Sequence, residues 1–568
     1  MSKANKKNAG FLAVLAVLMV AGIGGGILIS KNLGKSNHEI SRENALAQLD
    51  KKLKKIDCKE VSPRKATVEI SGSNLAEELP DIEKYPLSVR GNGNINIEIF
   101  SSTEKASKGT DGWLNEVAEK FNSSHYMVDD QWGTVSVRPI ASGAAIDYII
   151  SGKHVPEAYS PSNELWGEMV AAENVQIEMV EKRLAGNTAG ILIDKDTYNK
   201  LNASYGKVDI STIVEATVKS EIAMGYTNPY ASSTGLNFLV SALEEFDSTD
   251  ILSQSATEQF RKFQQNVPFV AYTTLQMREA ASNGVLQAFL MEYQGYYNAT
   301  ELRSYQYIPF GVRHDSPLYV VGDQVTAAQK TLAKAFADYC NQPDNQKLAK
   351  NYGFNYEEDY KSAEWDLQGR TLESAQKLWK TEKDAGNPVM AVFVADVSGS
   401  MSGAPLQNLQ SSLINASKYI NDSNYIGLVS YSTDVAVNLP IDKFDLNHRS
   451  YFTGAVEDLS PGGSTATYDA VLVALDLLRN AQAKVEAETG QTVKPLLFVL
   501  SDGATNVGCS LKDISHIVEG MEVPCYTIGY NANLEALQEL SAINEAASIN
   551  ADSDDVIYNL KSLFNAQM

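Results

Sequence analysis

The stretch Val389-Met390-Ala391-Val392-Phe393-Val394-Ala395-Asp396-Val397-Ser398-Gly399-Ser400 decides the fold of the C-terminal part of this chain. Its first eight residues are apolar without alternation until Asp396, as expected for a strand buried on both faces. Comparable apolar runs cover residues 426–430, 496–501 and 525–529, and segments with helical spacing separate them. This alternation predicts a doubly wound, Rossmann-like α/β domain over residues 388–568.

Oxygen-bearing side chains follow the ends of two of these predicted strands. Asp396, Ser398 and Ser400 come directly after the first strand, and Asp502 follows the strand that ends at residue 501. Thr465 lies in a glycine-rich loop before a predicted helix. Ligands of open α/β sheets collect at the carboxyl ends of strands, and hard oxygen donors suit Mg²⁺. We therefore predict a metal site; the alternative is a simple turn with a helix cap.

In its order and spacing this motif resembles the metal-ion-dependent adhesion site of the von Willebrand factor A (VWA) family, over residues 389–563. The resemblance implies that the three hydroxyls contact a divalent cation, first Mg²⁺, with Mn²⁺ or Ca²⁺ as alternatives. It implies that the two carboxylates act partly through bound water and that an acidic group of a partner protein fills an open coordination place. Asp469 is expected to cap or orient, and Asp396→Ala to abolish cation affinity without harm to the fold.

Residues 91–357 show strand and helix alternation with polar segments at the predicted strand ends and helix starts. This part resembles the two-lobed extracellular solute-binding proteins of bacterial uptake systems, a periplasmic-binding-protein-like fold. Hydroxyls and N–H groups at helix N-termini favour anions, so we expect a small anionic solute. The alternative is that these hydroxyls only cap helices. The candidate solute contacts are Ser101, Ser102, Ser142, Ser160, Ser162, Ser233 and Thr234.

An uncharged apolar run over residues 8–30 follows Lys3, Lys6 and Lys7. It is long enough for a transmembrane helix, and the preceding lysines hold that end in the cytoplasm. We expect a single-pass cell-membrane protein with its bulk outside; a cleaved signal peptide is the alternative. The predicted organisation is an anchor (1–35), a stalk and connector (36–90) with a charged helix at 41–55, the two-lobed domain (91–357), a linker helix (358–387) and the VWA domain (388–568).

Composition excludes some functions. A net charge of −22 over 568 residues offers no basic footprint for nucleic acid.

The four cysteines leave two alternatives: either Cys509 and Cys525 form the first disulfide pair, or the cysteines are buried free thiols. No catalytic motif is visible, and the histidines, His314 among them, are expected to stand alone in surface segments, so we predict no enzyme.

The predicted function is a cell-surface binding protein that recognises a protein partner through the cation of the VWA domain, coupled to solute sensing by the middle domain. The alternative is a solute receptor for an ABC-type transporter, in which the VWA domain serves as a docking module.

Overall fold

The computed structural model describes residues 42–68, 75–267, 269–271, 287–503 and 505–530, and parts of the segment 537–568. The chain forms two compact units. One comprises the N-terminal residues up to Ser73 together with Gly386–Met568, and the other comprises Asn74–Ala385. We call them the VWA unit and the middle unit.

A seven-stranded sheet forms the centre of the VWA unit, in the order β1-β15-β14-β13-β16-β17-β18. β13 pairs in parallel with β14 on one side and with β16 on the other, so the strand order reverses at β13. Only β15 runs antiparallel to its neighbour β14. The doubly wound prediction is confirmed. The strands are β1 (Cys58–Glu60), β13 (Val389–Asp396), β14 (Tyr425–Tyr431), β15 (Val435–Lys443), β16 (Lys494–Ser501), β17 (Cys525–Tyr530) and β18 (Ser548–Ala551).

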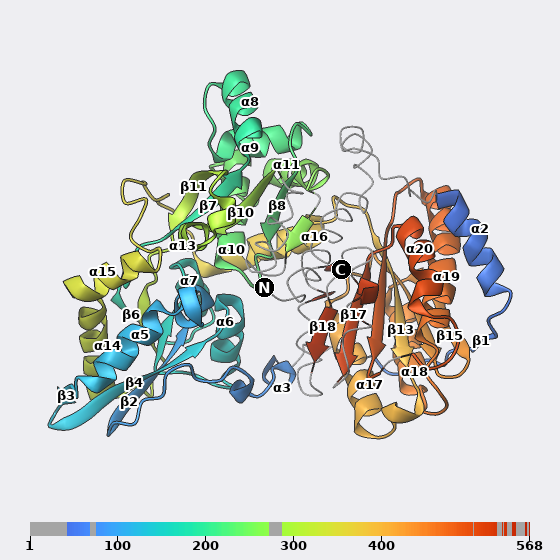
Figure 1. Cartoon of the computed structure of the whole chain (residues 1–568), viewed down its shortest axis with the longest axis horizontal. Coiled ribbons are helices and arrows are strands. Elements are labelled where there is room, and N and C mark those ends of the chain that lie inside the picture. Colours follow the sequence, from blue (N-terminus) through green and yellow to red (C-terminus); the bar gives the residue numbers. More distant parts are fainter. Residues whose placement is uncertain are drawn as a thin grey trace, which may run out of the picture. The chain divides into compact units, whose positions relative to one another are not determined.

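Both faces of this sheet are covered by helices (Figure 1). Successive residues of β13 point to opposite sides: Phe393 packs in the core below α17 and α18, and Val394 in the core below α19 and α20. Every residue of β13 is buried, which explains its unbroken apolar sequence. The helices are α2 (Arg42–Leu53), α17 (Ala404–Ala416), α18 (Leu446–Glu457), α19 (Thr467–Thr489) and α20 (Leu511–Met521).

The helix predicted as a stalk is instead part of the VWA unit. α2 packs against α20 and α19, and Leu49 is fully buried in their shared core. β1 then adds a parallel strand to the sheet edge at β15, with Cys58 opposite Val435. In a stalk, the apolar side of this helix would be exposed to water. Packing of α2 against α19 and α20 removes that side from water, which is favourable.

The middle unit contains two sheets and confirms the two-lobed α/β prediction. Lobe 1 has the strand order β3-β4-β2-β5-β12-β6 and lobe 2 the order β11-β7-β10-β8-β9. Strands of lobe 1 are β2 (Ile95–Ser101), β3 (Met127–Val128), β4 (Gln131–Pro139), β5 (Ala158–Ser160), β6 (Ile177–Glu181) and β12 (Leu318–Val321). Those of lobe 2 are β7 (Thr188–Ile193), β8 (Met224–Thr227), β9 (Phe269–Ala271), β10 (Ala288–Glu292) and β11 (Gln306–Arg313).

The chain crosses between the lobes after β6 and again after β11, and the strands that follow these crossings, β7 and β12, pair antiparallel with their neighbours. The helices of eight or more residues are α5 (Trp113–Ser123), α6 (Ser142–Ser151), α7 (Leu165–Ala172), α8 (Lys195–Tyr205), α9 (Ile210–Val218), α10 (Ser233–Phe246), α11 (Gln254–Gln264), α14 (Ala327–Cys340), α15 (Pro343–Asn351) and α16 (Gly369–Glu382). Shorter ones include α3 (Leu75–Glu78), α4 (Thr103–Ala106) and α13 (Tyr293–Asn298).

The predicted linker helix corresponds to α16 and belongs to the middle unit. It packs on α7, α10 and α11, and its Trp379 is fully buried, with the indole N–H donating to the Tyr226 hydroxyl at 2.7 Å. One long helix was expected over residues 327–351, but Pro343 starts a second helix there because its ring pre-sets the first helical turn.

All four cysteines are free thiols, so the pair Cys509 and Cys525 is not formed; Cys525 lies buried within β17. The apolar run 8–30 lies outside the described residues. Within the part of the chain that the structure describes, no helix is long and apolar enough to cross a membrane.

Candidate metal centre and interlobe site

Asp396 ends β13 at the point where the strand order reverses. Its side chain is fully buried and accepts hydrogen bonds at both oxygens. Oδ1 accepts from the backbone N–H of Ser398 at 2.8 Å. Oδ2 accepts from the Ser501 hydroxyl at 2.6 Å and from the Tyr431 hydroxyl at 3.4 Å. Three strands, β13, β14 and β16, therefore fix this carboxylate in place.

Ser398, Ser400 and Asp502 form a short polar chain beside it. The hydroxyls of Ser398 and Ser400 are 3.1 Å apart, and the Ser400 hydroxyl donates to Asp502 Oδ1 at 2.9 Å. Ser398 is buried, Ser400 is exposed and Asp502 is half-buried. The structure thus brings together residues that are about a hundred positions apart in the sequence.

The loop that carries Thr465 contacts the segment Asp396–Ser400 (the DxSxS segment) directly. Gly399 donates its N–H to the Gly463 carbonyl at 3.0 Å. Gly463 has a positive φ of 78°, and a Cβ there would lie 2.7 Å from the Thr433 hydroxyl, so glycine is required. Thr465 and Asn506 brace each other: the Thr465 N–H donates to Asn506 Oδ1 at 2.9 Å, and the Asn506 N–H donates to the Thr465 carbonyl at 2.9 Å.

Asp469 proves to be an orienting residue of the loop that follows Asp502. Its Oδ1 accepts from the Cys509 N–H at 2.9 Å. Ser501, Tyr431 and Asn506 support the site but lie outside the predicted ligand set. Their only signal was position: Ser501 and Tyr431 end strands of the sheet, and Asn506 follows β16 by a few residues.

The donor set fits a hard divalent cation. Two hydroxyls and two carboxylates meet on one rim, the loop of Thr465 is hydrogen-bonded to it, and Mg²⁺ takes oxygen ligands while keeping several waters. Burial raises the pKa of Asp396 by more than the hydrogen bonds from Ser501 and Ser398 lower it, and the negative charge of Asp502 adds to the rise. A cation at this rim offsets that repulsion. Among the described residues, no three His, Cys, Asp or Glu side chains cluster as a metal site.

The seven candidate solute residues all lie at the junction of the two lobes and are buried. Ser101 and Ser102 end β2, Ser160 ends β5, and Ser142 begins α6 on lobe 1. Ser233 and Thr234 begin α10 on lobe 2, and Figure 1 shows α10 between the two sheets. Each of these serines and threonines has at most a 5 % exposed surface, as does Ser162 after β5.

Hydrogen bonds join the two lobes across this junction. The Ser233 hydroxyl donates to the Ser142 hydroxyl at 3.2 Å and accepts from the Trp166 indole at 2.8 Å. A Cβ on Gly143 would lie 2.0 Å from the Tyr230 carbonyl, so the lobes meet closely there. The prediction of a small anionic solute took account of the hydroxyls only. It missed four buried or half-buried charged and titratable groups, namely Glu104, Lys105, Glu292 and His314.

His314, expected at the surface, is buried at the crossing after β11. Its Nδ1 lies 2.7 Å from Glu292 Oε1. Polar neighbours in the sequence made this segment look like a surface turn, and only the closure of the two lobes removes it from water.

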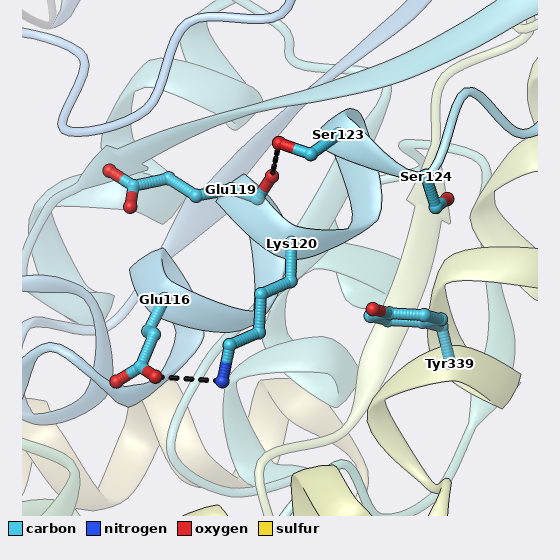
Figure 2. A pocket seen from close by; sticks show the side chains of 6 residues that line it. All are labelled: Glu116, Glu119, Lys120, Ser123, Ser124 and Tyr339. Atoms are coloured by element: carbon cyan, nitrogen blue, oxygen red, sulfur yellow. Dashed lines mark hydrogen bonds and ion pairs between the residues drawn. The ribbon is translucent and has the colours of Figure 1, made fainter.

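A surface pocket lies elsewhere in lobe 1, on the outer side of α5 (Figure 2). Its charged groups pair with one another: the Lys120 ammonium is 2.7 Å from the Glu116 carboxylate. None of the predicted solute residues lines it. The lining residues are Glu116, Glu119, Lys120, Ser123, Ser124 and Tyr339.

Comparisons with known families divide the chain in the same way. Residues 391–566 match the von Willebrand factor type A domain, and residues 106–355 match the bacterial extracellular solute-binding proteins. The protein is a fusion of an extracellular solute-binding domain with a VWA domain.

Curated relatives match less than a third of the chain. Inter-alpha-trypsin inhibitor heavy chain H3 of Bos taurus is 27% identical over 179 residues, which cover 29% of this chain and 20% of that protein. Heavy chain H4 of Homo sapiens is 26% identical over 182 residues, covering 30% and 19%. The chain thus spans about a fifth of the length of these relatives.

Solved structures resemble each unit separately. A von Willebrand factor type A protein from Catenulispora acidiphila has 15% identity and a TM-score of 0.29, covering 32% of this chain and 43% of its own. A periplasmic thiamin binding protein has 11% identity and a TM-score of 0.38, covering 53% and 99%.

Proposed function

We propose that this chain is a cell-surface binding protein whose VWA domain recognises a protein partner through a bound divalent cation. The observation that carries the proposal is the meeting of Ser398, Ser400 and Asp502 beside the buried Asp396 at the carboxyl edge of one sheet, with the loop of Thr465 joined to them through the Gly399–Gly463 hydrogen bond. When bound, the cation supplies a positive centre that attracts a carboxylate of the partner.

Some residues of the site orient its loops, and others are exposed where a partner protein can reach them. Asp396 is buried and accepts three hydrogen bonds, so it orients the loop and acts through water. Ser400 and Asp502 reach the surface, where an acidic group of a partner has access. Bracing of Thr465 by Asn506 holds the third loop rigid, which limits the entropy lost on binding.

The cell membrane is the proposed location, with a cytoplasmic N-terminus and the two units outside. The support is the uncharged apolar run 8–30 and the three lysines that precede it.

A transport receptor is the second candidate function, with the VWA domain as its docking module. The buried polar junction between the lobes favours it, because such a junction is where a two-lobed domain closes on a small molecule.

Panning of a random peptide library on phage tests the leading proposal. The full-length chain is immobilised in MgCl₂, and bound phage are eluted with EDTA. We expect the eluted peptides to be enriched in Asp and Glu, because a carboxylate completes the coordination of the cation.

The matched control is the Asp502→Ala chain, which keeps the same surface apart from one carboxylate. It should yield no enriched EDTA-eluted pool. Recovery of the same peptides from this variant, or a pool without acidic residues, contradicts the proposed function.

A further inference from the structure

The Lys105 side chain lies at the lobe junction and is fully buried. Its ammonium group donates to the Ser102 hydroxyl, to the Ser160 carbonyl at 3.0 Å and to the Pro161 carbonyl at 3.4 Å. A carboxylate oxygen of Glu104 is also 3.4 Å away. The Ser102 hydroxyl donates its own hydrogen bond to Glu104 at 2.6 Å, so an oxygen lone pair of Ser102 accepts from the Lys105 ammonium group. Four acceptors thus surround three protons.

A second carboxylate, Glu292 of lobe 2, faces the same region. It accepts from Asn187 Nδ2 at 3.1 Å, from the Thr234 hydroxyl at 3.2 Å and from His314 Nδ1 at 2.7 Å. Burial lowers the pKa of Lys105, while the negative charges of Glu104 and Glu292 act against that fall. Lys105 therefore interacts electrostatically with a carboxylate from each lobe.

His314 is held by amides on one side and by Glu292 on the other. The amide of Asn237 is fixed because its Nδ2 donates to the Val312 carbonyl at 2.8 Å and its Oδ1 accepts from the Val312 N–H at 3.0 Å. The same Nδ2 lies 3.1 Å from His314 Nε2, and Asn163 Nδ2 lies 3.0 Å from it.

The junction therefore places the carboxylates of Glu104 and Glu292 and several carbonyl acceptors around the Lys105 ammonium group. Asn163 Oδ1 and Ser160 Oγ are also buried there without a hydrogen-bond partner. An anion placed among these groups would meet two negative charges and several carbonyl oxygens, which the helix N-termini do not offset.

We infer that the lobe junction is a binding site for a primary ammonium group, and that this chain fills the site with its own Lys105. The middle domain then closes without a diffusible solute, and the solutes excluded from its junction are oxyanions. This inference goes beyond the leading proposal, which concerns the VWA domain, and it counts against the transport receptor as the second candidate function. It replaces the expectation of a small anionic solute.

The test is chemical rescue of Lys105→Ala in the full-length chain. The change leaves both carboxylates and the carbonyl acceptors in place and creates room for the missing three methylenes and the ammonium. All five tryptophans lie in the middle unit, so tryptophan emission follows its unfolding: they are Trp113, Trp132, Trp166, Trp365 and Trp379.

We expect n-propylammonium chloride to raise the variant's unfolding midpoint by roughly 2 °C or more above NaCl of equal ionic strength, because a ligand of the folded state stabilises it. The wild type and the control Lys120→Ala, an exposed lysine of α5, should show no such gain, and neutral n-propanol should not replace the amine. Equal effects of amine and NaCl on Lys105→Ala overturn the inference.

If Lys105→Ala does not fold in NaCl, the yield of native tryptophan emission on refolding with and without propylammonium is measured instead, and no gain counts against the site. Calorimetric titration of the wild-type chain with sodium sulfate and sodium phosphate gives an independent answer. We expect no saturable heat; binding of one oxyanion per chain that is lost in Lys105→Ala overturns the inference.

Discussion

Asp396→Ala should destabilise the VWA unit, whereas Asp502→Ala should not, although both remove a carboxylate from the same rim. Asp396 is fully buried, and its loss leaves the Ser501 hydroxyl and the Ser398 N–H without their acceptor. Each buried donor left unpaired costs about 1–3 kcal/mol. The Ser501 hydroxyl keeps the Gly503 carbonyl at 3.1 Å as a second acceptor, which lowers its share.

The expected loss for Asp396→Ala is about 2–4 kcal/mol of unfolding free energy, which for a unit of this size lowers Tm by roughly 4–16 °C. Asp502 is half-buried and accepts one hydrogen bond from the exposed Ser400, so its removal should stay within about 0.5 kcal/mol. The expectation that Asp396→Ala spares the fold treated this residue as part of an exposed rim. Because Asp396 is buried, we now expect the substitution to lower the stability of the unit.

Differential scanning calorimetry of both full-length variants in EDTA measures the difference without any contribution from metal. The VWA unit contains no tryptophan, so its transition is the one that tryptophan emission does not follow. Equal Tm values for the two variants, or a larger loss in Asp502→Ala, would refute the assigned roles.

Two further predictions concern the packing of each unit. Leu49→Ala in α2 should lower the Tm of the VWA transition, because replacing a buried leucine by alanine costs about 2–5 kcal/mol of unfolding free energy. The control is Leu446→Ala on α18, which should change the Tm little because that side chain is 58% exposed. Equal effects of the two substitutions would mean that α2 is not part of the core. Burial and the positive charge of Lys383 lower the pKa of Lys380 to about 6 in the folded chain, from 10.5 in the unfolded chain. Between these two pH values the unfolded chain binds more protons than the folded chain, so the stability of the middle unit rises with pH. Lys380→Met should flatten the rise of the tryptophan-monitored midpoint between pH 6 and pH 9, and Lys377→Met on the same helix should retain it.

Much of the VWA unit followed from local sequence. The buried strand β13 and the DxSxS segment after it can both be recognised from a stretch of about a dozen residues. Doubly wound sheets bind ligands at the carboxyl ends of their strands, so the place of the site also followed from the sequence. β1 was not predictable in this way, because Cys58, Lys59 and Glu60 are all exposed and show no strand pattern. It forms because the edge of β15 offers unpaired backbone groups.

The charge of the lobe junction was the main feature that local reasoning missed. Glu104 and Lys105 stand in a polar run, and Arg313, His314 and Asp315 follow one another, so both segments resemble solvated surface. Burial of Lys105 and His314 arises from closure of two lobes whose contacts are far apart in sequence. Hydroxyls at helix starts were recognised, but their charged neighbours Glu104, Lys105 and Glu292 were not.

Calorimetric titration of the metal-free, full-length chain with MgCl₂, repeated with MnCl₂, tests the central claim most directly. The account predicts one cation per chain, lost in Asp502→Ala and in Thr465→Ala and retained in Ser464→Ala, the neighbouring loop residue. Unchanged cation binding in both Asp502→Ala and Thr465→Ala would contradict the metal centre and, with it, the proposed mode of partner recognition.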